Sequence, residues 1–340
     1  MNSPLLKQVL SEYSIKRARA IEEAENRKKE LLDVNPKLQE IENELSKISI
    51  EAAKSIITAD EEKKKKILAE LKKNSNALIK EKNNILKELS KSTDFLKPHF
   101  ECNMCKDTGF VEKNGKSVMC SCLKQEIYDI AYNKSNMGNL DRENFSTFNI
   151  RYFSDKPDKE RFKSDISPRE NMNLLREKAN NFIENFDDPT EKNLIFTGGT
   201  GLGKTFLSNC IAAEVLKQGK TVLYQTAPVM LDSILDEKFG KSDNGFNLME
   251  NILTTNLLII DDLGTEKISE TKITELFTII NTRLLNQNHS ITKTIISTNL
   301  TANELFSTYT TRIGSRLAGS YRFLRFFGDD IRLKKGKKEI

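Results

Sequence analysis

Residues 198–205 read GGTGLGKT, and this stretch decides the fold of the second half of the chain. An apolar run at 193–197 comes directly before it and an amphipathic pattern at 206–216 follows, so the loop joins a buried strand to a helix. Glycines let successive backbone N–H groups turn inward without Cβ clashes and form a nest for phosphate oxygens. The start of the helix adds partial positive charge. The sequence predicts a nucleoside triphosphate site formed by Gly198, Gly199, Thr200, Gly201, Leu202, Gly203, Lys204 and Thr205.

Four polar side chains at this site are expected to have separate roles. Lys204 should reach the β- and γ-phosphates, and the Thr205 hydroxyl should bind Mg²⁺. Asp261 and Asp262 follow a second apolar run, where a strand would end beside the phosphates. We expect Asp261 to hold Mg²⁺, directly or through water, and Asp262 to polarise the attacking water.

The remaining pattern predicts an α/β domain. Apolar runs at 221–225 and 293–298 read as further buried strands, and a helical pattern covers 270–285. Strands that alternate with helices in this way form a parallel sheet. Asn299 follows the strand at 293–298, where its amide is expected to hydrogen-bond the attacking water or the γ-phosphate.

The last 29 residues are basic. Residues 312–340 carry nine basic and three acidic side chains, which favours either solubility or contact with the phosphates of nucleotide or nucleic acid. One or two of the arginines are candidates to neutralise the transferring phosphoryl group, and the others would be solvated or face DNA. The aromatic residues among them would either stack on single-stranded DNA or lie in the core. The arginines are Arg312, Arg316, Arg322, Arg325 and Arg332, and the aromatic residues are Tyr321, Phe323, Phe326 and Phe327.

Four of the five cysteines are arranged like zinc ligands. Cys102 and Cys105 form a CxxC pair, Cys120 and Cys122 form a CxC pair, and fourteen residues lie between the two pairs. Two short loops can direct four thiolates at one tetrahedral ion, so we expect Zn²⁺; the alternative is a cluster of thiols without a metal. His99 is a second candidate for the fourth ligand. The remaining cysteine, Cys210, is expected to be a core residue of the helix behind the phosphate loop.

Residues 1–97 form a helical region without glycine. Apolar residues recur at steps of three and four from 38 to 52, and the same steps from 68 to 89 are apolar except for Ser75 and Lys82. This is heptad spacing with a charged outer face. Asn35-Pro36 is expected to interrupt the first helix, and residues 58–61 read as a capping box that opens the last. So thin an apolar seam indicates a hairpin, either alone or bound to a partner protein.

The bulk composition narrows the class of protein. The 340 residues include no Trp and only two His, which argues against a catalytic site centred on histidine. No apolar run approaches the roughly 20 residues that span a bilayer, and no signal peptide is evident. We therefore expect a cytoplasmic protein without membrane contact, whose thiols stay reduced.

The order of these motifs resembles that of a known family. Phosphate loop, LLIIDDLG, STN, TRIGSRLAG and FFGDDIRL follow one another as in the AAA+ ATPases of the bacterial replicative-helicase loaders, the DnaC/DnaI family, which have an IstB-like core. The likeness covers about residues 98–335. It implies an α/β AAA+ ATPase domain with a P-loop, preceded by a zinc-binding module and an N-terminal coiled-coil-like domain.

The resemblance also implies roles for single residues. Lys204 and Thr205 match Walker A, and Asp261 with Asp262 matches Walker B. Asn299 matches sensor 1. Arg316 matches the arginine finger and Arg332 matches sensor 2. Asp262 stands where the wider AAA+ pattern has glutamate, so the shorter side chain predicts slow hydrolysis.

The function implied by the resemblance is that of a helicase loader. Such a protein uses ATP and Mg²⁺, associates with itself through its ATPase domain, binds a DnaB-type hexameric helicase and helps to place it on single-stranded DNA. Slow hydrolysis would be stimulated by the partner or by single-stranded DNA. The alternatives are an IstB-like transposition ATPase and an ATP-binding adaptor with little hydrolysis.

The predicted organisation has four parts. The sequence leaves open whether loading opens a ring or assembles one, and what the resting oligomeric state is. It also leaves open whether the arginine finger acts between subunits or within one. The parts are a helical helicase-interacting domain (1–97), a zinc-binding module (98–135), a linker (136–168) and the AAA+ ATPase domain (169–340).

Overall fold

The computed structural model describes residues 4–58, 61–133, 140, 142–240, 247–287 and 289–332. It divides into two compact units, one of residues 10–111 and one of residues 1–9 and 112–340. Among the described residues, no helix combines the length and apolar character that crossing a membrane requires.

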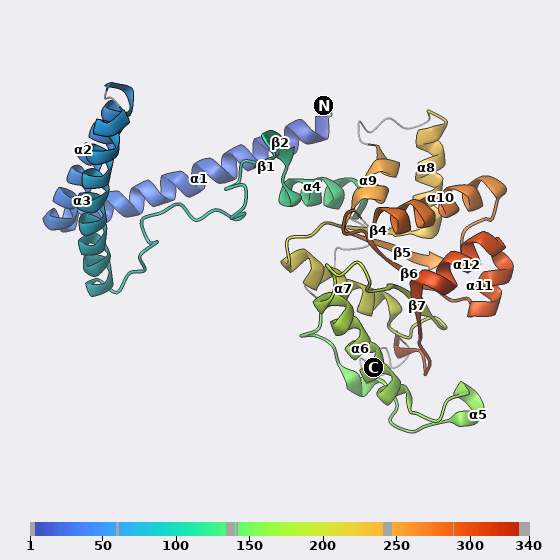
Figure 1. Cartoon of the computed structure of the whole chain (residues 1–340). Helices are drawn as coiled ribbons and strands as arrows, with labels where there is room; N and C mark the ends of the chain where they lie inside the picture. The colour runs from blue at the N-terminus through green and yellow to red at the C-terminus, as the bar shows by residue number, and fades with distance from the viewer. Residues whose placement is uncertain are drawn as a thin grey trace. The chain divides into compact units, whose positions relative to one another are not determined.

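Three long helices dominate the unit of residues 10–111 (Figure 1). They are α1 (Pro4–Val34), α2 (Pro36–Thr58) and α3 (Glu61–Glu88). The predicted break before Pro36 is confirmed, and the Asn35 side chain accepts a hydrogen bond from the backbone N–H of Leu38 at 3.0 Å, which caps the start of α2. The capping box predicted at 58–61 includes residues 59 and 60, which lie outside the described part of the chain.

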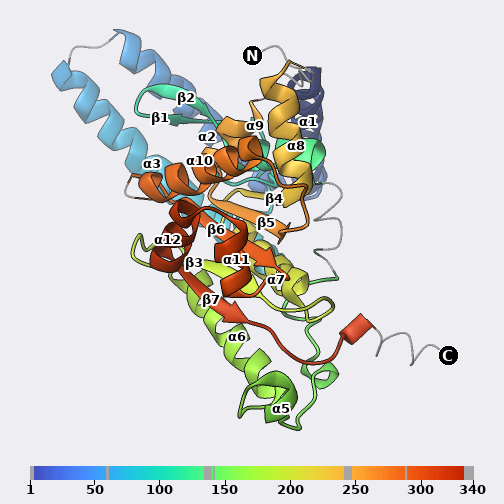
Figure 2. The same cartoon turned by 90° about the vertical axis from the view of Figure 1, so that its right-hand side faces the viewer.

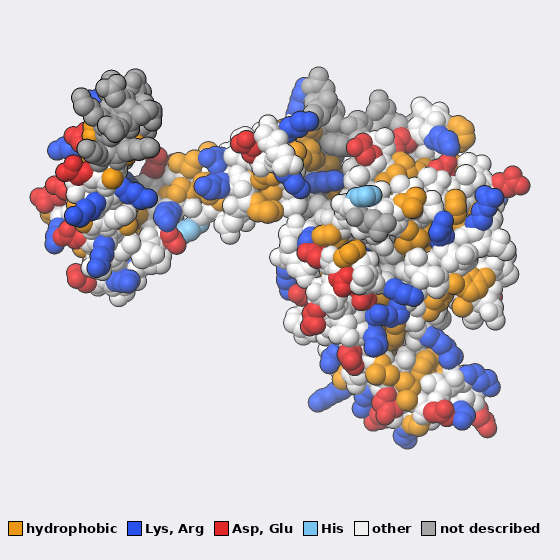
Figure 3. Space-filling model, in the orientation of Figure 1, with side chains coloured by type: hydrophobic (Ala, Val, Ile, Leu, Met, Phe, Trp, Pro, Cys, Tyr) orange, Lys and Arg blue, Asp and Glu red, His pale blue; other side chains and the backbone are white. Residues whose placement is uncertain are grey.

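Helices α2 and α3 pack along the predicted seam. Leu38, Ile41 and Ile85 are buried there. The half-buried carboxylate of Glu42 pairs with the ammonium groups of Lys28 and Lys82. Outside the seam, Lys, Arg, Asp and Glu side chains are mixed on the helix surfaces (Figure 3).

Residues 95–106 form an irregular segment along α1. The Arg27 guanidinium donates to the carbonyl oxygens of Phe95 and Lys97, both at 3.1 Å. The Arg17 guanidinium lies 5.1 Å from the centre of the Phe100 ring. These contacts fix the segment that leads to the first cysteine pair.

The unit of residues 112–340 is built on a parallel sheet of five strands in the order β4-β5-β6-β3-β7. Consecutive strands are therefore not all neighbours, and their carboxyl ends meet at one edge of the sheet. The strands are β3 (Asn193–Thr197), β4 (Val222–Thr226), β5 (Leu257–Leu263), β6 (Lys293–Thr298) and β7 (Tyr321–Arg325).

Helices cover both faces of this sheet (Figure 2). Alternate strand residues point to opposite faces, so Phe196 lies in one apolar cluster and Ile195 in the other. One face is covered by α6 (Pro168–Glu184) and α7 (Lys204–Lys217). The other is covered by α8 (Ala227–Lys238), α9 (Leu248–Thr254), α10 (Glu270–Asn286), α11 (Ala302–Thr308) and α12 (Thr311–Ser320).

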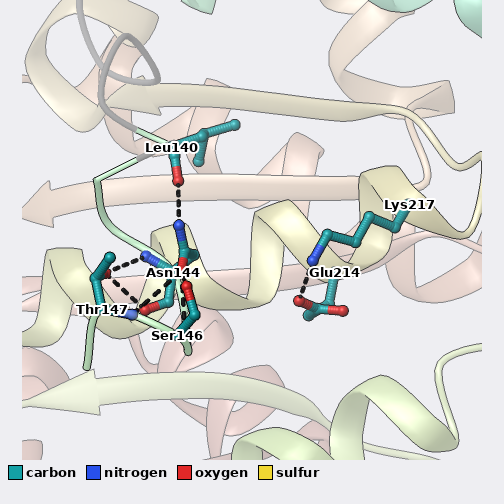
Figure 4. Close-up of polar contacts among 6 residues, drawn as sticks. All are labelled: Leu140, Asn144, Ser146, Thr147, Glu214 and Lys217. Carbon is teal, nitrogen blue, oxygen red and sulfur yellow. Dashed lines mark hydrogen bonds and ion pairs between the residues drawn. The ribbon is translucent and has the colours of Figure 1, made fainter. Parts of the chain in front are cut away.

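The segment before α6 contains short elements. A turn around Asn144 lies beside α7 (Figure 4), where the Asn144 side chain donates to Leu140 and accepts from the backbone N–H groups of Ser146 and Thr147. The elements are β1 (Phe110–Lys113), β2 (Lys116–Met119), α4 (Ser121–Tyr128), the π-helix η1 (Asp129–Asn133), the 3-10 helix η2 (Ile150–Tyr152) and α5 (Lys159–Phe162).

Two of the four C-terminal aromatic residues lie in the core, within strand β7 or directly after it. Tyr321 is 3% exposed and Phe326 is 2% exposed, and Phe326 packs against Phe196 in the core. Arg322 pairs with Glu191 at 3.2 Å, and the Arg325 guanidinium donates to the carbonyl oxygen of Phe162 at 2.6 Å. These contacts stabilise the outer strand, and Phe323 within it and Phe327 after it are half-buried.

Candidate nucleotide-binding site

The phosphate loop connects β3 to α7 at the carboxyl edge of the sheet. Gly198 has a φ of +144°, and a Cβ built on it would lie 2.2 Å from the carbonyl oxygen of Phe326. Only glycine fits here, because residues that follow β7 press against the loop. Gly203 comes directly before α7, so the N–H groups of the first helical turn face the same space.

Lys204 lies at the centre of the site. Its ammonium group donates to the carbonyl oxygens of Gly198 at 2.7 Å and Gly199 at 2.8 Å, and to the Asn299 side-chain oxygen at 2.8 Å. All three ammonium donors are therefore used. Burial lowers the pKa of Lys204, and the carboxylates of Asp262 and Asp261 oppose this shift. The predicted neighbours Lys204 and Asn299 are brought into direct contact.

Asp261 is buried and accepts hydrogen bonds on both carboxylate oxygens. Its Oδ2 accepts from the hydroxyl of Thr205 at 3.1 Å and from the phenol of Tyr224 at 2.6 Å. Its Oδ1 accepts from the Ser297 hydroxyl and from the backbone N–H of Asp262 at 3.0 Å. The two predicted Mg²⁺ ligands, Thr205 and Asp261, are therefore adjacent, and two further residues hold the carboxylate in place.

Asp262 is presented to the pocket by an irregularity in β5. The pairing of β5 with β6 shifts register between Ile260 and Leu263, and Asp262 has a φ of +54°. A left-handed backbone is rare for aspartate and costs energy, which is typical of functional sites. Burial raises the pKa of Asp262, and the charge of Asp261 raises it further. A raised carboxyl pKa suits a group that accepts a proton.

A pocket of about 310 Å³ lies over the loop and brings most of the predicted residues together. Its walls include Lys204, Thr205, Asp262, Asn299 and Arg332. One side of it comes from the segment that the sequence indicated only as a linker. That side consists of Glu143, Thr147, Phe148, Asn149, Tyr152 and Phe153.

These wall residues were not predicted as part of the site. The available signal in the sequence was the recurrence of aromatic residues in this segment. In the structure, Phe148 and Phe153 stack with ring centres 6.2 Å apart and pack on the core beside α7. Tyr224 and Ser297 were missed as well. Both lie within predicted strands, and a strand pattern does not reveal which inward side chain reaches a carboxylate on the neighbouring strand.

The two predicted arginines occupy different places. Arg332 lines the pocket, and its charge acts on both Lys204 and Asp262. Arg316 is exposed on α12 and does not line the pocket of its own chain.

The donor set fits a magnesium–nucleotide complex. Helix-start amides and Lys204 provide positive potential for a triphosphate, and Thr205 and Asp261 are the oxygen ligands that Mg²⁺ prefers. The roles of the individual side chains stay predictions, whereas their proximity is a property of the fold.

The four cysteines of the predicted zinc site lie close together. Their sulfur atoms are all within 4.8 Å of one another. The first loop is tightened by Asp107, whose carboxylate accepts from the backbone N–H groups of Glu101 at 2.9 Å and Cys102 at 2.8 Å. Lys106 and Asp107 both have positive φ, as the turn requires. The members of the cluster are Cys102, Cys105, Cys120 and Cys122.

Two other candidates are separate from this cluster. His99 is not in the group; its ring nitrogen lies 3.5 Å from the Arg27 guanidinium. Cys210 is buried in the core, and burial raises the pKa of its thiol to about 12. A thiol in that environment stays protonated and unreactive, as predicted.

Comparison with known proteins places the nucleotide site in a family. Residues 161–338 match the model of the IstB-like ATP binding protein family. The replicative helicase loader DnaC of Escherichia coli (strain K12) is 28% identical over 169 residues, which are 49% of this chain and 66% of the loader. The chain thus spans slightly less than two thirds of that relative. The putative ATP-binding protein of insertion sequence IS1162 from Pseudomonas fluorescens is 27% identical over 111 residues, 32% of this chain and 47% of that protein.

Among solved structures, the crystal structure of DnaI matches with a TM-score of 0.44 and 20% identity, covering 56% of this chain and 94% of that one. The family match takes in more than half of the chain and includes the phosphate loop and the ends of β5 and β6. This protein therefore belongs to the IstB-like ATP-binding protein family, and its sequence is similar to that of the replicative helicase loader DnaC.

Proposed function

We propose that the protein is an ATP-dependent loader of a DnaB-type hexameric replicative helicase, which it helps to place on single-stranded DNA during the initiation of replication. The observation that carries this proposal is the pocket in which Lys204, Asp262, Asn299 and Arg332 surround one space of about 310 Å³. The named relative, a replicative helicase loader, supports the choice of partner.

In this proposal the residues of the chain divide the work of hydrolysis. Lys204 exchanges its contacts with Gly198, Gly199 and Asn299 for phosphate oxygens, which frees the Asn299 amide to orient the attacking water. Asp262 accepts the proton of that water, helped by its raised pKa.

Thr205 and Asp261 would hold Mg²⁺, which when bound neutralises charge on the β- and γ-phosphates. Asp262 is one methylene shorter than the usual glutamate, so the proposed hydrolysis is slow. The helicase or single-stranded DNA would stimulate it by ordering the site.

Arg316 is proposed to act on the nucleotide of a neighbouring subunit. Its exposure on α12, outside the pocket of its own chain, supports a role in a second copy's site. Self-association through the ATPase domain would then be required for turnover.

The cysteine cluster is proposed to hold one structural Zn²⁺. Tetrahedral zinc with sulfur ligands at about 2.3 Å places the sulfurs about 3.8 Å apart. The observed spread, within 4.8 Å, is compatible with that geometry.

The nucleotide site is tested by Lys204→Ala in the full chain. Without the ammonium group, nucleotide binding measured by calorimetry should weaken at least about tenfold. Lys217→Ala is the matched control, because Lys217 lies at the other end of α7 in an exposed pair with Glu214. Normal ATP binding and turnover by Lys204→Ala would overturn the assignment of the loop.

The helicase partner is tested by pull-down from the source cell with and without ATP. Recovery of the replicative helicase supports the loader. Recovery of a transposase with preferential binding of double-stranded DNA would favour the alternative, a transposition ATPase, to which the family match and the insertion-sequence relative also point. Tight ATP binding without turnover, even with helicase and single-stranded DNA, would favour an adaptor.

The subunit arrangement is tested by mixing variants. Arg316→Ala and Asp262→Asn should each bind ATP and hydrolyse it poorly, and mixing them should restore part of the turnover because some interfaces then carry one intact site. Arg312→Ala, exposed one turn earlier on α12, is the control and should hydrolyse ATP normally. Absence of rescue at every mixing ratio would assign Arg316 to its own subunit.

A further inference from the structure

Strand β4 is an outer strand of the parallel sheet, paired on one side with β5. The backbone groups on its other side need partners, because unpaired N–H and C=O groups at a sheet edge are costly or attract other strands. No further strand supplies them within the described chain. Helix α4 and the π-helix η1 lie against β4 instead (Figure 1).

Two side-chain amides of this helical segment take the place of a neighbouring strand. Gln125 accepts from the backbone N–H of Val222 at 2.7 Å and donates to its carbonyl oxygen at 3.0 Å. Asn133 donates to the same carbonyl at 2.9 Å and accepts from the backbone N–H of Tyr224 at 2.9 Å. Each amide thus offers β4 one hydrogen-bond donor and one acceptor, as a peptide group of a neighbouring strand would.

Asp129 fixes the orientation of both amides. Its Oδ1 accepts from the side-chain nitrogen of Gln125 and from that of Asn133, both at 2.8 Å. A carboxylate accepts only, so each amide must turn its nitrogen to Asp129, and its oxygen is left for the N–H groups of β4. The three residues recur every four positions, which places them on one side of the helical segment.

Tyr224 connects this edge to the nucleotide site. Its backbone N–H is held by Asn133, and its phenol donates to Oδ2 of Asp261 at 2.6 Å. The same oxygen accepts from Thr205.

We propose that Gln125, Asp129 and Asn133 are positioning residues for the magnesium site, acting through Tyr224 on the carboxylate of Asp261. The amides of Gln125 and Asn133 hold β4 in the position in which the Tyr224 phenol can donate to Asp261. The hydrogen bond from the phenol in turn fixes the orientation of the Asp261 carboxylate toward Thr205. This inference rests on the proposed function, in which Asp261 and Thr205 hold the Mg²⁺ of the bound nucleotide.

The test is a Mg²⁺ titration of nucleotide binding by the full chain. Calorimetry measures the affinity for a non-hydrolysable ATP analogue in EDTA and at increasing Mg²⁺ concentration. Loss of a partner of a metal-binding carboxylate typically costs 10–100-fold in metal affinity, so Tyr224→Phe should raise the half-maximal Mg²⁺ concentration about tenfold. Asn133→Ala should raise it by less, and Gln125→Ala, which leaves the bond to Tyr224, by less again.

The double variant separates coupling from general damage. If Asn133 acts through the phenol, adding Asn133→Ala to Tyr224→Phe should change the Mg²⁺ dependence no further. Affinity in EDTA should stay at the wild-type value in every variant. Asn171→Ala is the matched control, because the Asn171 amide donates to the carbonyl of Arg325 on the opposite outer strand, at 2.9 Å, with no contact to Asp261.

The outcomes distinguish this inference from the proposed function. No nucleotide binding, or no effect of Mg²⁺ on wild-type binding, would refute the proposed function itself. A normal Mg²⁺ response in wild type, unchanged in Asn133→Ala and Gln125→Ala, would overturn the inference alone. An equal shift in Asn171→Ala would also overturn it, since that shift would report general loosening of the sheet. If Asn133→Ala does not fold, Gln125→Ala and Tyr224→Phe still decide between these outcomes.

Discussion

Replacing Gly201 by alanine should destabilise the unit of residues 112–340 in a way that depends on the carboxylate of Asp330. Gly201 has a φ of +68°, and a Cβ built on it would lie 1.8 Å from Oδ1 of Asp330. Real Cβ atoms stay at least 3.0 Å from such neighbours, so the two groups would have to separate by a further 1.2 Å. The backbone of Ile331 donates to the carbonyl of Gly201 at 2.9 Å and resists that movement.

The magnitude follows from two separable terms. Left-handed backbone costs alanine about 1–2 kcal/mol. Turning the Asp330 carboxylate away from its rotamer costs about 0.5–1.5 kcal/mol more, because the clash is with the end of a side chain. Gly240 provides the matched control, because it has the same φ of +68° and nothing within 4 Å of its Cβ position. Gly240→Ala should therefore show the first term only.

The assay is scanning calorimetry of the full chain, following the transition that added ATP shifts upward. One kcal/mol corresponds to about 2–4 °C for a domain of this size, so Gly201→Ala should melt roughly 1–6 °C below Gly240→Ala. Adding Asp330→Ala should remove this extra loss. Equal melting temperatures for the two glycine variants, or no relief from Asp330→Ala, would refute the placement of the C-terminal segment against the phosphate loop.

Three further predictions concern the charged and sulfur-containing groups. Asp262→Asn should raise the melting temperature at neutral pH, because the pKa of Asp262 is raised in the folded state and its ionised form there destabilises the fold. The gain should vanish as the pH falls below the ordinary aspartate range, and a gain independent of pH would contradict this. Arg283→Met should lower the free energy of unfolding in urea by about 3 kcal/mol or more, since the buried guanidinium donates to the carbonyls of Thr255 at 3.0 Å and Lys293 at 2.6 Å; a loss within about 0.5 kcal/mol would argue against this network. Elemental analysis should find about one zinc per chain in wild type and in Cys210→Ala but clearly less in Cys105→Ser, and equal content in all three would exclude the cysteine cluster as the zinc site.

Local sequence pattern was enough to predict the core elements of the unit of residues 112–340. The strand at 193–197, the loop at 198–205 and the helix after it are coded by neighbouring residues, because apolar runs, glycines and helical periodicity act over a few positions. The carboxylates at the end of β5 and the amide after β6 were predicted as site residues for the same reason. Parallel strands bring their carboxyl ends together whatever the details of packing.

Long-range packing decided what the pattern left open. Tyr321 and Phe326 looked equally suited to core and to DNA, and their burial in and after β7 depends on pairing with a strand more than 120 residues earlier. The linker supplied Phe148 and Tyr152 to the pocket, which its sparse periodicity did not indicate. The contacts of Tyr224 with Asp261 and Asn133 join segments far apart in the chain.

The sequence by itself determined that a triphosphate-binding loop exists and which acidic residues accompany it, because those features depend on local backbone chemistry. Only the tertiary structure decided which side chains hold Asp261, which wall encloses the pocket and which arginine lies inside it. Those outcomes depend on the order of the strands and on the packing of the helical segment 121–133 against β4. Both require contacts between residues far apart in the chain, so no local stretch of sequence predicts them.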